Sequence, residues 1–259
     1  MWLLAVTIFA GLKWLTWWKA RRQIRQARWR SVAYLMAWPG MDPDSFLDSE
    51  RHANRPTFEA WLWAILKTAL GAIFLWAVAR LVPESDGLSR GWVGMLGLIL
   101  LLHFGSFQIL ALAWQRAGVA ATPIMCVPLR SRSLSEFWGK RWNLGFRQLS
   151  HDLIFRPLHG VLGVGGAAFL VFVISGLVHD LVISVPAKGG YGLPTFYFVV
   201  QWAGVAVERS HVGKRFGLGR GVSGWIFTAV ITAAPAFCLF HAPFVRSVIL
   251  PFMKAIGAL

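Results

Sequence analysis

Long apolar runs are the feature of this sequence that most restricts its fold. A helix that crosses a bilayer needs about 20 mostly apolar residues. Six runs approach this length, although the fifth is short: Trp2–Trp18, Phe58–Val82, Trp92–Trp114, Val161–Val185, Leu193–Val207 and Val222–Phe240. The tail after Pro243 contains Pro251 and Lys254 and is too broken to define another span. We therefore predict an all-α, polytopic membrane bundle of about six to eight transmembrane helices, with interfacial amphipathic helices, in a single domain.

The basic residues predict how such a bundle would be oriented. Of the 26 lysines and arginines, 19 lie in three alternate connections, residues 19–57, 115–160 and 208–221. The positive-inside rule places these connections in the cytoplasm. Within the first of them we expect Lys19–Arg30 to form a helix on the anionic leaflet. The first apolar run has no basic segment before it and no small-residue cleavage site, so we expect an uncleaved span.

Composition excludes several other classes of protein. The net charge is +15, yet 56% of the residues are hydrophobic and only 14% are charged, against roughly 25% in soluble domains. Nucleic-acid binders spread their basic residues over a polar surface, which this chain lacks, so we expect no nucleic-acid partner. The 15 Trp and 19 Phe exclude disorder. The two cysteines fit no metal spacing and no disulfide framework, and we predict no metal site.

The second basic connection contains a predicted amphipathic helix. Ser133 and Glu136 have the spacing of a capping box, so we expect a helix from Leu134 to about His151. Its apolar stripe is Leu134, Trp138, Trp142, Gly145 and Leu149. Asn143 lies on a different, polar face. Such a helix could anchor to the lipid headgroups or present its amide to a functional site, and the pattern alone leaves both open.

The fourth apolar run carries an adjacent pair of ionisable residues, His179 and Asp180. Such residues are rare inside membrane helices and usually face a cavity or a partner. On a helix, His179 shares a face with Ser175 and Gly176, where small side chains allow a neighbouring helix or a substrate to approach. A neutral imidazole there could remove a proton from a hydroxyl group. Alternatively, the pair could hold helices together.

The remaining histidines give weaker signals. His103 lies inside the third run, and we expect it to be packed and hydrogen-bonded. The others lie in basic connections or at the ends of runs, where we expect solvated or interfacial side chains: His52, His151, His159, His211 and His241.

The segment Leu134–Asn143, read with Ser175–Asp180, resembles the membrane-bound O-acyltransferase superfamily. That superfamily carries a motif in which Phe-Trp is followed closely by Trp-Asn, and then a histidine in an apolar helix. The wax-synthase-like branch, long-chain-alcohol O-acyltransferases, is the most similar. The run Trp38–Asp42 resembles bacterial members, which implies a bacterial inner membrane. The resemblance implies one membrane-bound O-acyltransferase-like domain over residues 1–259, with a motif-bearing core at about 120–210.

The resemblance also implies roles for individual residues. His179 matches the histidine that acts as general base, and Asn143 matches the motif asparagine that positions the reacting groups. Trp138, Arg141 and Trp142 match positions that shape the substrate site. Asp180 stands where Glu is common in this branch, and we group it with the substrate-binding residues.

The implied reaction moves a fatty acyl group from acyl-coenzyme A to the hydroxyl of a lipophilic alcohol within the bilayer. The donor is a substrate, and no bound cofactor is implied. Alternatives are a sterol-like, glycerolipid or glycan acceptor, or a small membrane transporter or scaffold without enzymatic activity. No internal repeat or pair of broken helices favours a transporter. The sequence predicts neither the oligomeric state nor the acyl-chain length.

Overall fold

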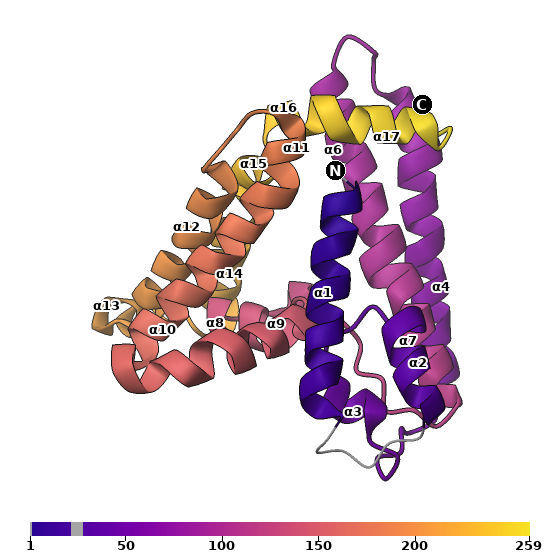
Figure 1. Cartoon of the computed structure of the whole chain (residues 1–259). Coiled ribbons are helices and arrows are strands. Elements are labelled where there is room, and N and C mark those ends of the chain that lie inside the picture. Colours follow the sequence, from indigo (N-terminus) through magenta and orange to yellow (C-terminus); the bar gives the residue numbers. More distant parts are fainter. Residues whose placement is uncertain (1, 22–27) are drawn as a thin grey trace. The chain divides into compact units, whose positions relative to one another are not determined.

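A computed structural model describes residues 2–21 and 28–259, and all regular secondary structure within these residues is helical (Figure 1). The predicted all-α class is therefore confirmed. Four helical runs are long and apolar enough to cross a membrane: Phe58–Leu81, Gly87–Arg116, Leu144–Ala187 and Gly221–Leu239. They coincide with the second, third, fourth and sixth predicted runs. The protein is thus an integral membrane protein by the length and composition of its helices.

The first and fifth predicted runs form helices that are not among these four. Helix α12 (Leu193–Arg209) has 17 residues and is therefore about 25 Å long. That is shorter than a hydrocarbon core of about 30 Å. Helix α1 (Trp2–Ala20) carries Lys13 in its middle. The predicted count of six to eight spans is therefore not confirmed, and four candidates remain. The centre of the helix predicted over Lys19–Arg30, residues 22–27, lies outside the described residues.

The described chain divides into two compact units. The N-terminal unit contains Trp2–Met125, Leu144–Leu149 and Ile249–Leu259. The motif unit contains Cys126–Asn143 and Ser150–Val248, and therefore every candidate site residue. The single domain predicted for the whole chain stays a prediction.

Two long helical runs pack closely in the N-terminal unit. The first comprises α4 (Phe58–Ile73), η1 (Phe74–Val78) and α5 (Ala79–Leu81). The second comprises α6 (Gly87–Leu98), η2 (Ile99–Ser106) and α7 (Phe107–Arg116). A Cβ atom on Gly71 would lie 2.4 Å from the backbone nitrogen of Leu101, so only glycine permits this crossing. In η2, His103 packs edge-on against Phe107, but its Nδ1 has no hydrogen-bond partner among the described residues. The expected packing of His103 is therefore found, but no hydrogen bond is found at Nδ1 within the described residues.

The Trp38–Asp42 run organises the rest of the N-terminal unit. Trp38 is buried and stacks on Phe46 in α3 (Pro43–Leu47), with ring centroids 5.8 Å apart. The buried side-chain nitrogen of Lys13 donates to the carbonyl of Gly40. Asp42 is the N-cap of α3 and accepts a hydrogen bond from the backbone of Ser45. The motif is thus a structural junction between α1 and α3.

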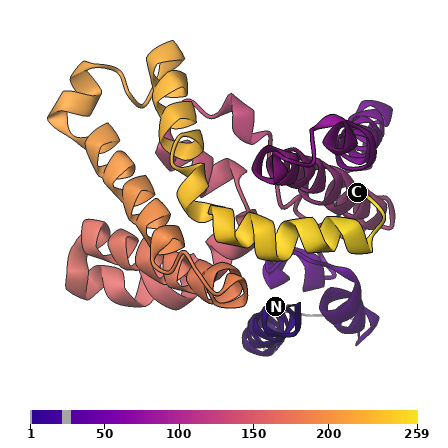
Figure 2. The same ribbon diagram turned by 90° about the horizontal axis from the view of Figure 1, so that it is seen from above.

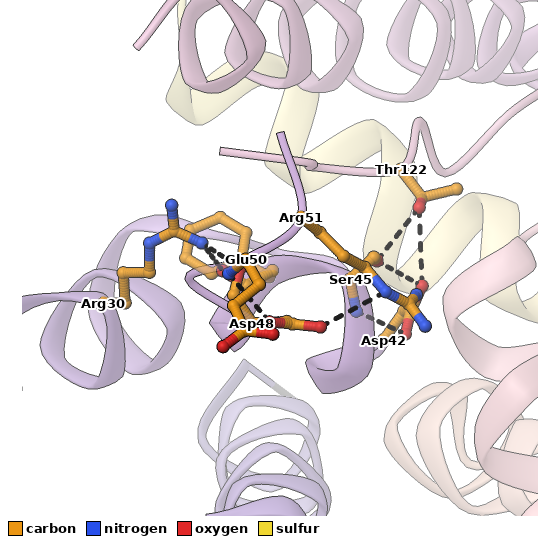
Figure 3. A network of polar contacts seen from close by, with 8 residues as sticks. Arg30, Asp42, Ser45, Asp48, Glu50, Arg51 and Thr122 are labelled. Carbon is orange, nitrogen blue, oxygen red and sulfur yellow. Dashed lines mark hydrogen bonds and ion pairs between the residues drawn. The ribbon is translucent and has the colours of Figure 1, made fainter. Parts of the chain in front are cut away.

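Polar side chains extend this junction, as Figure 3 shows. Ser45 and Thr122 both donate to the Asp42 carboxylate, and their hydroxyls are 3.1 Å apart. Arg30, in α2 (Arg28–Ala37), donates to the carbonyl of Asp48. Because buried polar groups must be paired, this network specifies one arrangement of the segment.

The motif unit is built around two neighbouring helices, α10 (Arg156–His179) and α12 (Figures 1 and 2). Helix α10 is interrupted at Gly163, where φ is +68°. A Cβ atom on Gly176 would lie 2.6 Å from the Cα of Thr195 in α12. The small residues beside His179 therefore admit a neighbouring helix, as the sequence predicted. Other helices of this unit include η3 (Pro128–Arg130), η6 (Asp180–Ser184), α11 (Val185–Ala187), α13 (His211–Arg215), α14 (Gly221–Ala233), α15 (Ala236–Leu239) and α16 (Ala242–Phe244).

Candidate active site

The predicted amphipathic helix begins as expected but is not continuous. Ser133 is the N-cap and accepts a hydrogen bond from the backbone of Glu136. The chain is helical through α8 (Leu134–Glu136) and η4 (Phe137–Arg141), and then becomes extended at Trp142. Helix α9 (Leu144–Ser150) begins after this break and is followed by η5 (His151–Phe155). The prediction of one helix from Leu134 to about His151 is therefore wrong at Trp142–Asn143.

The break places Asn143 in the left-handed region, with φ of +42°. Asparagine is one of the few residues other than glycine that occupies this region readily, because its short amide can bond locally. Because the helix ends here, the carbonyl of Arg141 accepts a hydrogen bond from outside the helix, from the backbone N–H of Cys126, at 2.8 Å. The motif asparagine thus stands at a sharp turn rather than on a helix face.

Trp138 anchors the motif segment to the core of its unit. Its indole N–H donates to the side-chain oxygen of Gln201, at 3.3 Å. The amide of this fully buried Gln201 donates in turn to the carbonyl of Ile231, at 2.7 Å. The indole ring also contacts Phe172 and Phe198, with centroids 5.8 and 5.7 Å away. Trp138 is therefore fixed in both position and rotation.

His179 is held by the backbone of its own helix. Its Nδ1 lies 2.7 Å from the carbonyl oxygen of Ser175. A carbonyl can only accept a hydrogen bond, so in the neutral ring Nδ1 carries the proton and Nε2 carries a lone pair. The ring packs on Phe198, with centroids 4.6 Å apart, and remains partly exposed. Trp138 and His179 therefore pack against the same phenyl ring. That Asn143 and His179 act on the same reacting groups, as the resemblance implies, stays a prediction.

Asp180 caps a helix. Its Oδ1 accepts hydrogen bonds from the backbone of Gly192 and the hydroxyl of Ser184, each at 2.8 Å. Its Oδ2 accepts from the backbone N–H of Thr195, at 3.0 Å, and from the hydroxyl of the same residue. Gly192, the N-cap of α12, has no side chain with which to cap that helix. The Asp180 carboxylate supplies the missing acceptor for the first turn.

Arg141 and Trp142 complete the motif segment. Trp142 stacks on Phe137, with ring centroids 5.4 Å apart. Arg141 forms an ion pair of 2.6 Å with Glu136. The backbone N–H of Arg132, together with Arg141, lowers the pKa of Glu136 below its usual value, so this carboxylate is ionised at neutral pH.

Arg141 also lines a pocket with a volume of about 710 Å³. The wall includes two further arginines, Arg130 and Arg132, neither of which forms an ion pair within the described residues. The other lining residues are Leu129, Glu136, Gly221, Val222 and Trp225. Three guanidinium groups and one carboxylate make this pocket attractive to an anion with several charged oxygens.

Two of the basic connections meet at this end of the motif unit. The buried Glu208 accepts hydrogen bonds from the backbone of Leu134 and Ser135. Trp225 donates to the carbonyl of Leu129, at 2.8 Å. The start of the motif helix is therefore tied to the connection between α12 and α14.

Sequence reasoning missed several residues that build the site. Gln201 and Glu208 were detectable as polar groups within and just after the fifth apolar run, where an unpaired group is costly. Phe198 had no signal, because it is one of many aromatic residues. His241 was expected to be interfacial or solvated, but it is only 3% exposed. That expectation is wrong because tertiary packing covers its ring.

The fold and the site together define an integral membrane protein with a partly exposed histidine in an aromatic core, beside a motif that ends in a Trp-Asn turn. Residues 121–200 match the membrane bound O-acyl transferase family. This segment contains all six candidate site residues. The resemblance to that superfamily is thereby confirmed, and the relatives named next confirm the resemblance to its wax-synthase-like branch.

Named relatives agree with this assignment at modest identity. The chain is 30% identical over 120 residues to a long-chain-alcohol O-fatty-acyltransferase of Simmondsia chinensis, covering 41% of this chain and 34% of the relative. It is 27% identical over 150 residues to probable long-chain-alcohol O-fatty-acyltransferase 7 of Arabidopsis thaliana, covering 50% and 42%. Acyl-CoA–sterol O-acyltransferase 1 of Arabidopsis thaliana is 39% identical over 62 residues, covering 21% and 18%. The matched part spans less than half of each relative.

Proposed function

We propose that the protein is an O-acyltransferase that transfers a fatty acyl group from acyl-coenzyme A to a lipophilic alcohol. The observation that carries this proposal is the hydrogen bond from His179 to the carbonyl of Ser175, which leaves Nε2 as a base on a partly exposed ring. The match of residues 121–200 to the acyltransferase family supports the same reaction.

The reaction is a direct displacement. Nε2 of His179 removes the proton from the acceptor hydroxyl as the oxygen attacks the thioester carbonyl carbon. The new C–O bond forms, the C–S bond breaks, and the coenzyme A thiolate takes the proton from the imidazolium. Because Nδ1 keeps its hydrogen bond to Ser175 throughout, the ring does not need to rotate between the two proton transfers. Asn143 positions the reacting groups in this scheme.

The donor's phosphate groups fit the arginine pocket best. Arg130 and Arg132 are free to bind phosphate oxygens, and Arg141 is held in the pocket wall by its ion pair with Glu136. Trp225 and Val222 offer an apolar wall to the organic part of the donor. The pocket is lined by residues from the second and third basic connections, so the charge distribution and the pocket favour donor entry from one side of the membrane.

We further propose that this side is the cytoplasm and that the membrane is a bacterial inner membrane. The named relatives are plant proteins, so this part of the proposal rests on the basic connections and the Trp38–Asp42 run. No nucleic-acid partner is proposed.

A fatty alcohol is the acceptor that we favour, since two of the relatives described above are named for long-chain alcohols. A sterol is the second candidate, because the segment shared with the sterol acyltransferase has the higher identity, 39%. A glycerolipid or glycan acceptor and a non-enzymatic transporter have no comparable support.

The experiment is a product assay with the purified protein in lipid nanodiscs. Labelled acyl-coenzyme A is supplied with hexadecanol, with cholesterol, with diacylglycerol or with no acceptor, and the lipids are separated. We expect labelled wax ester, dependent on hexadecanol, together with stoichiometric thiol release. Sterol ester alone would select the second candidate. Donor binding or movement across the membrane without ester formation would overturn the proposal.

A further inference from the structure

Three side chains of the motif unit, those of His241, Ser184 and Asp180, form a hydrogen-bonded path that ends at the residue after His179. His241 and Ser184 are both buried, and neither has a role in the proposed reaction. Nε2 of His241 lies 3.2 Å from the hydroxyl oxygen of Ser184, which lies 2.8 Å from Oδ1 of Asp180. These contacts connect the start of α16 to the residue that follows His179.

The direction of each hydrogen bond in this path can be assigned. The backbone N–H of Phe244 donates to Nδ1 of His241, at 3.2 Å, so the neutral ring carries its proton on Nε2. That proton points to Ser184. The single hydroxyl hydrogen of Ser184 then goes to the Asp180 carboxylate, its nearer acceptor, rather than to the carbonyl of Gly190 at 3.2 Å. Burial lowers the pKa of His241, although Asp180 opposes this shift, and a neutral ring suits both bonds.

The same histidine packs on the loop that leads into α12. A Cβ atom on Gly190 would lie 2.5 Å from three atoms of the imidazole ring, and φ at Gly190 is +72°. No other residue type fits that combination of conformation and contact. His241 therefore fixes the loop by direct packing and, through Ser184, fixes the orientation of the Asp180 carboxylate.

Asp180 passes this restraint to the ring of His179. Its carboxylate holds the backbone of Gly192 and Thr195, and so sets the first turn of α12. Phe198 lies three residues after Thr195, on the same helix face, and its ring contacts His179. Movement of the first turn of α12 would therefore move the phenyl ring against which the candidate base packs.

We propose that His241 is a positioning residue for His179, acting through Ser184, Asp180 and the first turn of α12. This inference rests on the proposed acyl transfer. Ser184 itself is not a nucleophile, since its proton goes to Asp180 rather than to His241 and its side chain is fully buried. A displacement of about 1 Å at a reacting group can cost roughly a hundredfold in rate, so a remote restraint of this kind has measurable consequences.

Two substitutions separate the bonds of His241. His241→Asn keeps an acceptor near Nδ1 for the Phe244 N–H but cannot reach Ser184. His241→Gln keeps a donor near Nε2 for Ser184. We expect kcat to fall roughly tenfold to a hundredfold in the Asn variant, with KM for acyl-coenzyme A nearly unchanged, and to recover largely in the Gln variant. His211→Asn, the same change at an exposed histidine, is the matched control.

A double-variant cycle tests the path. Ser184→Ala removes the central hydroxyl from the hydrogen-bonded path between His241 and Asp180. Combining it with His241→Asn should therefore give no further loss of kcat. Independent sites would instead give additive losses in transition-state free energy. Equal kcat in His241→Asn and wild type would overturn the inference. So would an equal loss in the Asn and Gln variants, because the bond to Ser184 would then not be the cause.

A readout independent of turnover keeps this inference distinguishable from the proposed function. Diethyl pyrocarbonate modifies unprotonated imidazole nitrogens, and mass spectrometry follows its reaction at His179. We expect faster modification of His179 in His241→Asn than in wild type, His241→Gln or His211→Asn. An unchanged rate would count against the positioning role, whether or not the wild-type protein forms an ester. Absence of ester in the wild type with an altered rate would overturn the acyl transfer alone.

Discussion

At the scale of single residues, a backbone carbonyl rather than a second ionisable side chain determines which ring nitrogen of His179 carries the proton. The neighbouring Asp180 is directed to α12, and the carbonyl of Ser175 selects the ring tautomer. A histidine in an apolar helix therefore needs no carboxylate partner to present a lone pair at Nε2. The adjacent pair in the sequence separates into a candidate base and a helix cap.

Two substitutions of Asn143 separate the contribution of its left-handed backbone conformation from that of its side-chain amide. Asn143→Gly keeps the left-handed turn and removes the amide, whereas Asn143→Ala removes the amide and strains the turn by about 1–2 kcal/mol. We expect both variants to lose activity alike, because in the proposed reaction the amide positions the reacting groups. Only the Ala variant should also unfold at a lower temperature. Thermal unfolding and ester formation measured side by side decide this, and full activity in the Gly variant would contradict it.

The residue scale is also where sequence reasoning stops. His179 and Asn143 could be selected from motif and spacing, because a histidine in an apolar run and a Trp-Asn pair are unusual. The left-handed turn at Asn143 could not, since an apolar stripe continues across it and periodicity does not register one backbone angle. The burial of His241 and the contact of Phe198 with His179 depend on packing between segments far apart in the chain.

At the scale of elements, close packing of α10 on α12 holds the candidate base beside its aromatic neighbours. Four of the six expected runs are recovered by length and apolarity alone. The short α12 is positioned by its contacts: its first turn is capped by Asp180, Gln201 bonds Trp138, and Glu208 caps the motif helix. Through these hydrogen bonds, a helix that is too short to be a candidate span is connected to both Asp180 and the motif segment.

Glycine at the α10–α12 crossing gives a test at this scale. A methyl group on Gly176 would lie 2.6 Å from the Cα of Thr195, so Gly176→Ala forces the helices apart despite its better helix propensity. We expect a loss of about 1–3 kcal/mol in the free energy of unfolding, as for other overpacked cores. Gly165→Ala, in the same helix but with no atom near the new methyl, is the control and should be neutral or stabilising. Equal stability of the two variants in detergent micelles would contradict the crossing.

At the scale of the whole molecule, the net charge of +15 on a chain that is 56% hydrophobic bears on two properties, its orientation in the membrane and its donor site. The distribution of the basic residues predicts orientation, and three arginines in one pocket suggest where an anionic donor binds. Composition and spacing are the basis for the first property, and the orientation stays a prediction. The second required the folded motif unit, because Arg130 and Arg132 lie in the second basic connection whereas Trp225 lies in α14.

The arginine pocket predicts how donor affinity depends on charge. The double variant Arg130→Gln and Arg132→Gln should raise KM for acyl-coenzyme A by roughly tenfold or more, since charge-assisted hydrogen bonds contribute about 1.5–3 kcal/mol each. The KM of this variant should also respond less to added salt than that of the wild type. The control variant Arg156→Gln removes one positive charge from an exposed position outside the pocket and should leave both properties unchanged. Equal effects at the two positions would contradict a donor site here.

The most direct measurement is the rate of ester formation by His179→Ala, compared with the wild type and with His159→Ala, which changes an exposed histidine. All three proteins are purified in nanodiscs, matched for thermal unfolding, and given acyl-coenzyme A and hexadecanol. Because a general base contributes about 10²–10⁴-fold, we expect His179→Ala to lose at least a hundredfold in kcat while His159→Ala keeps wild-type activity. Ester formation by a folded His179→Ala protein at the wild-type rate would contradict the assignment of His179 as the base.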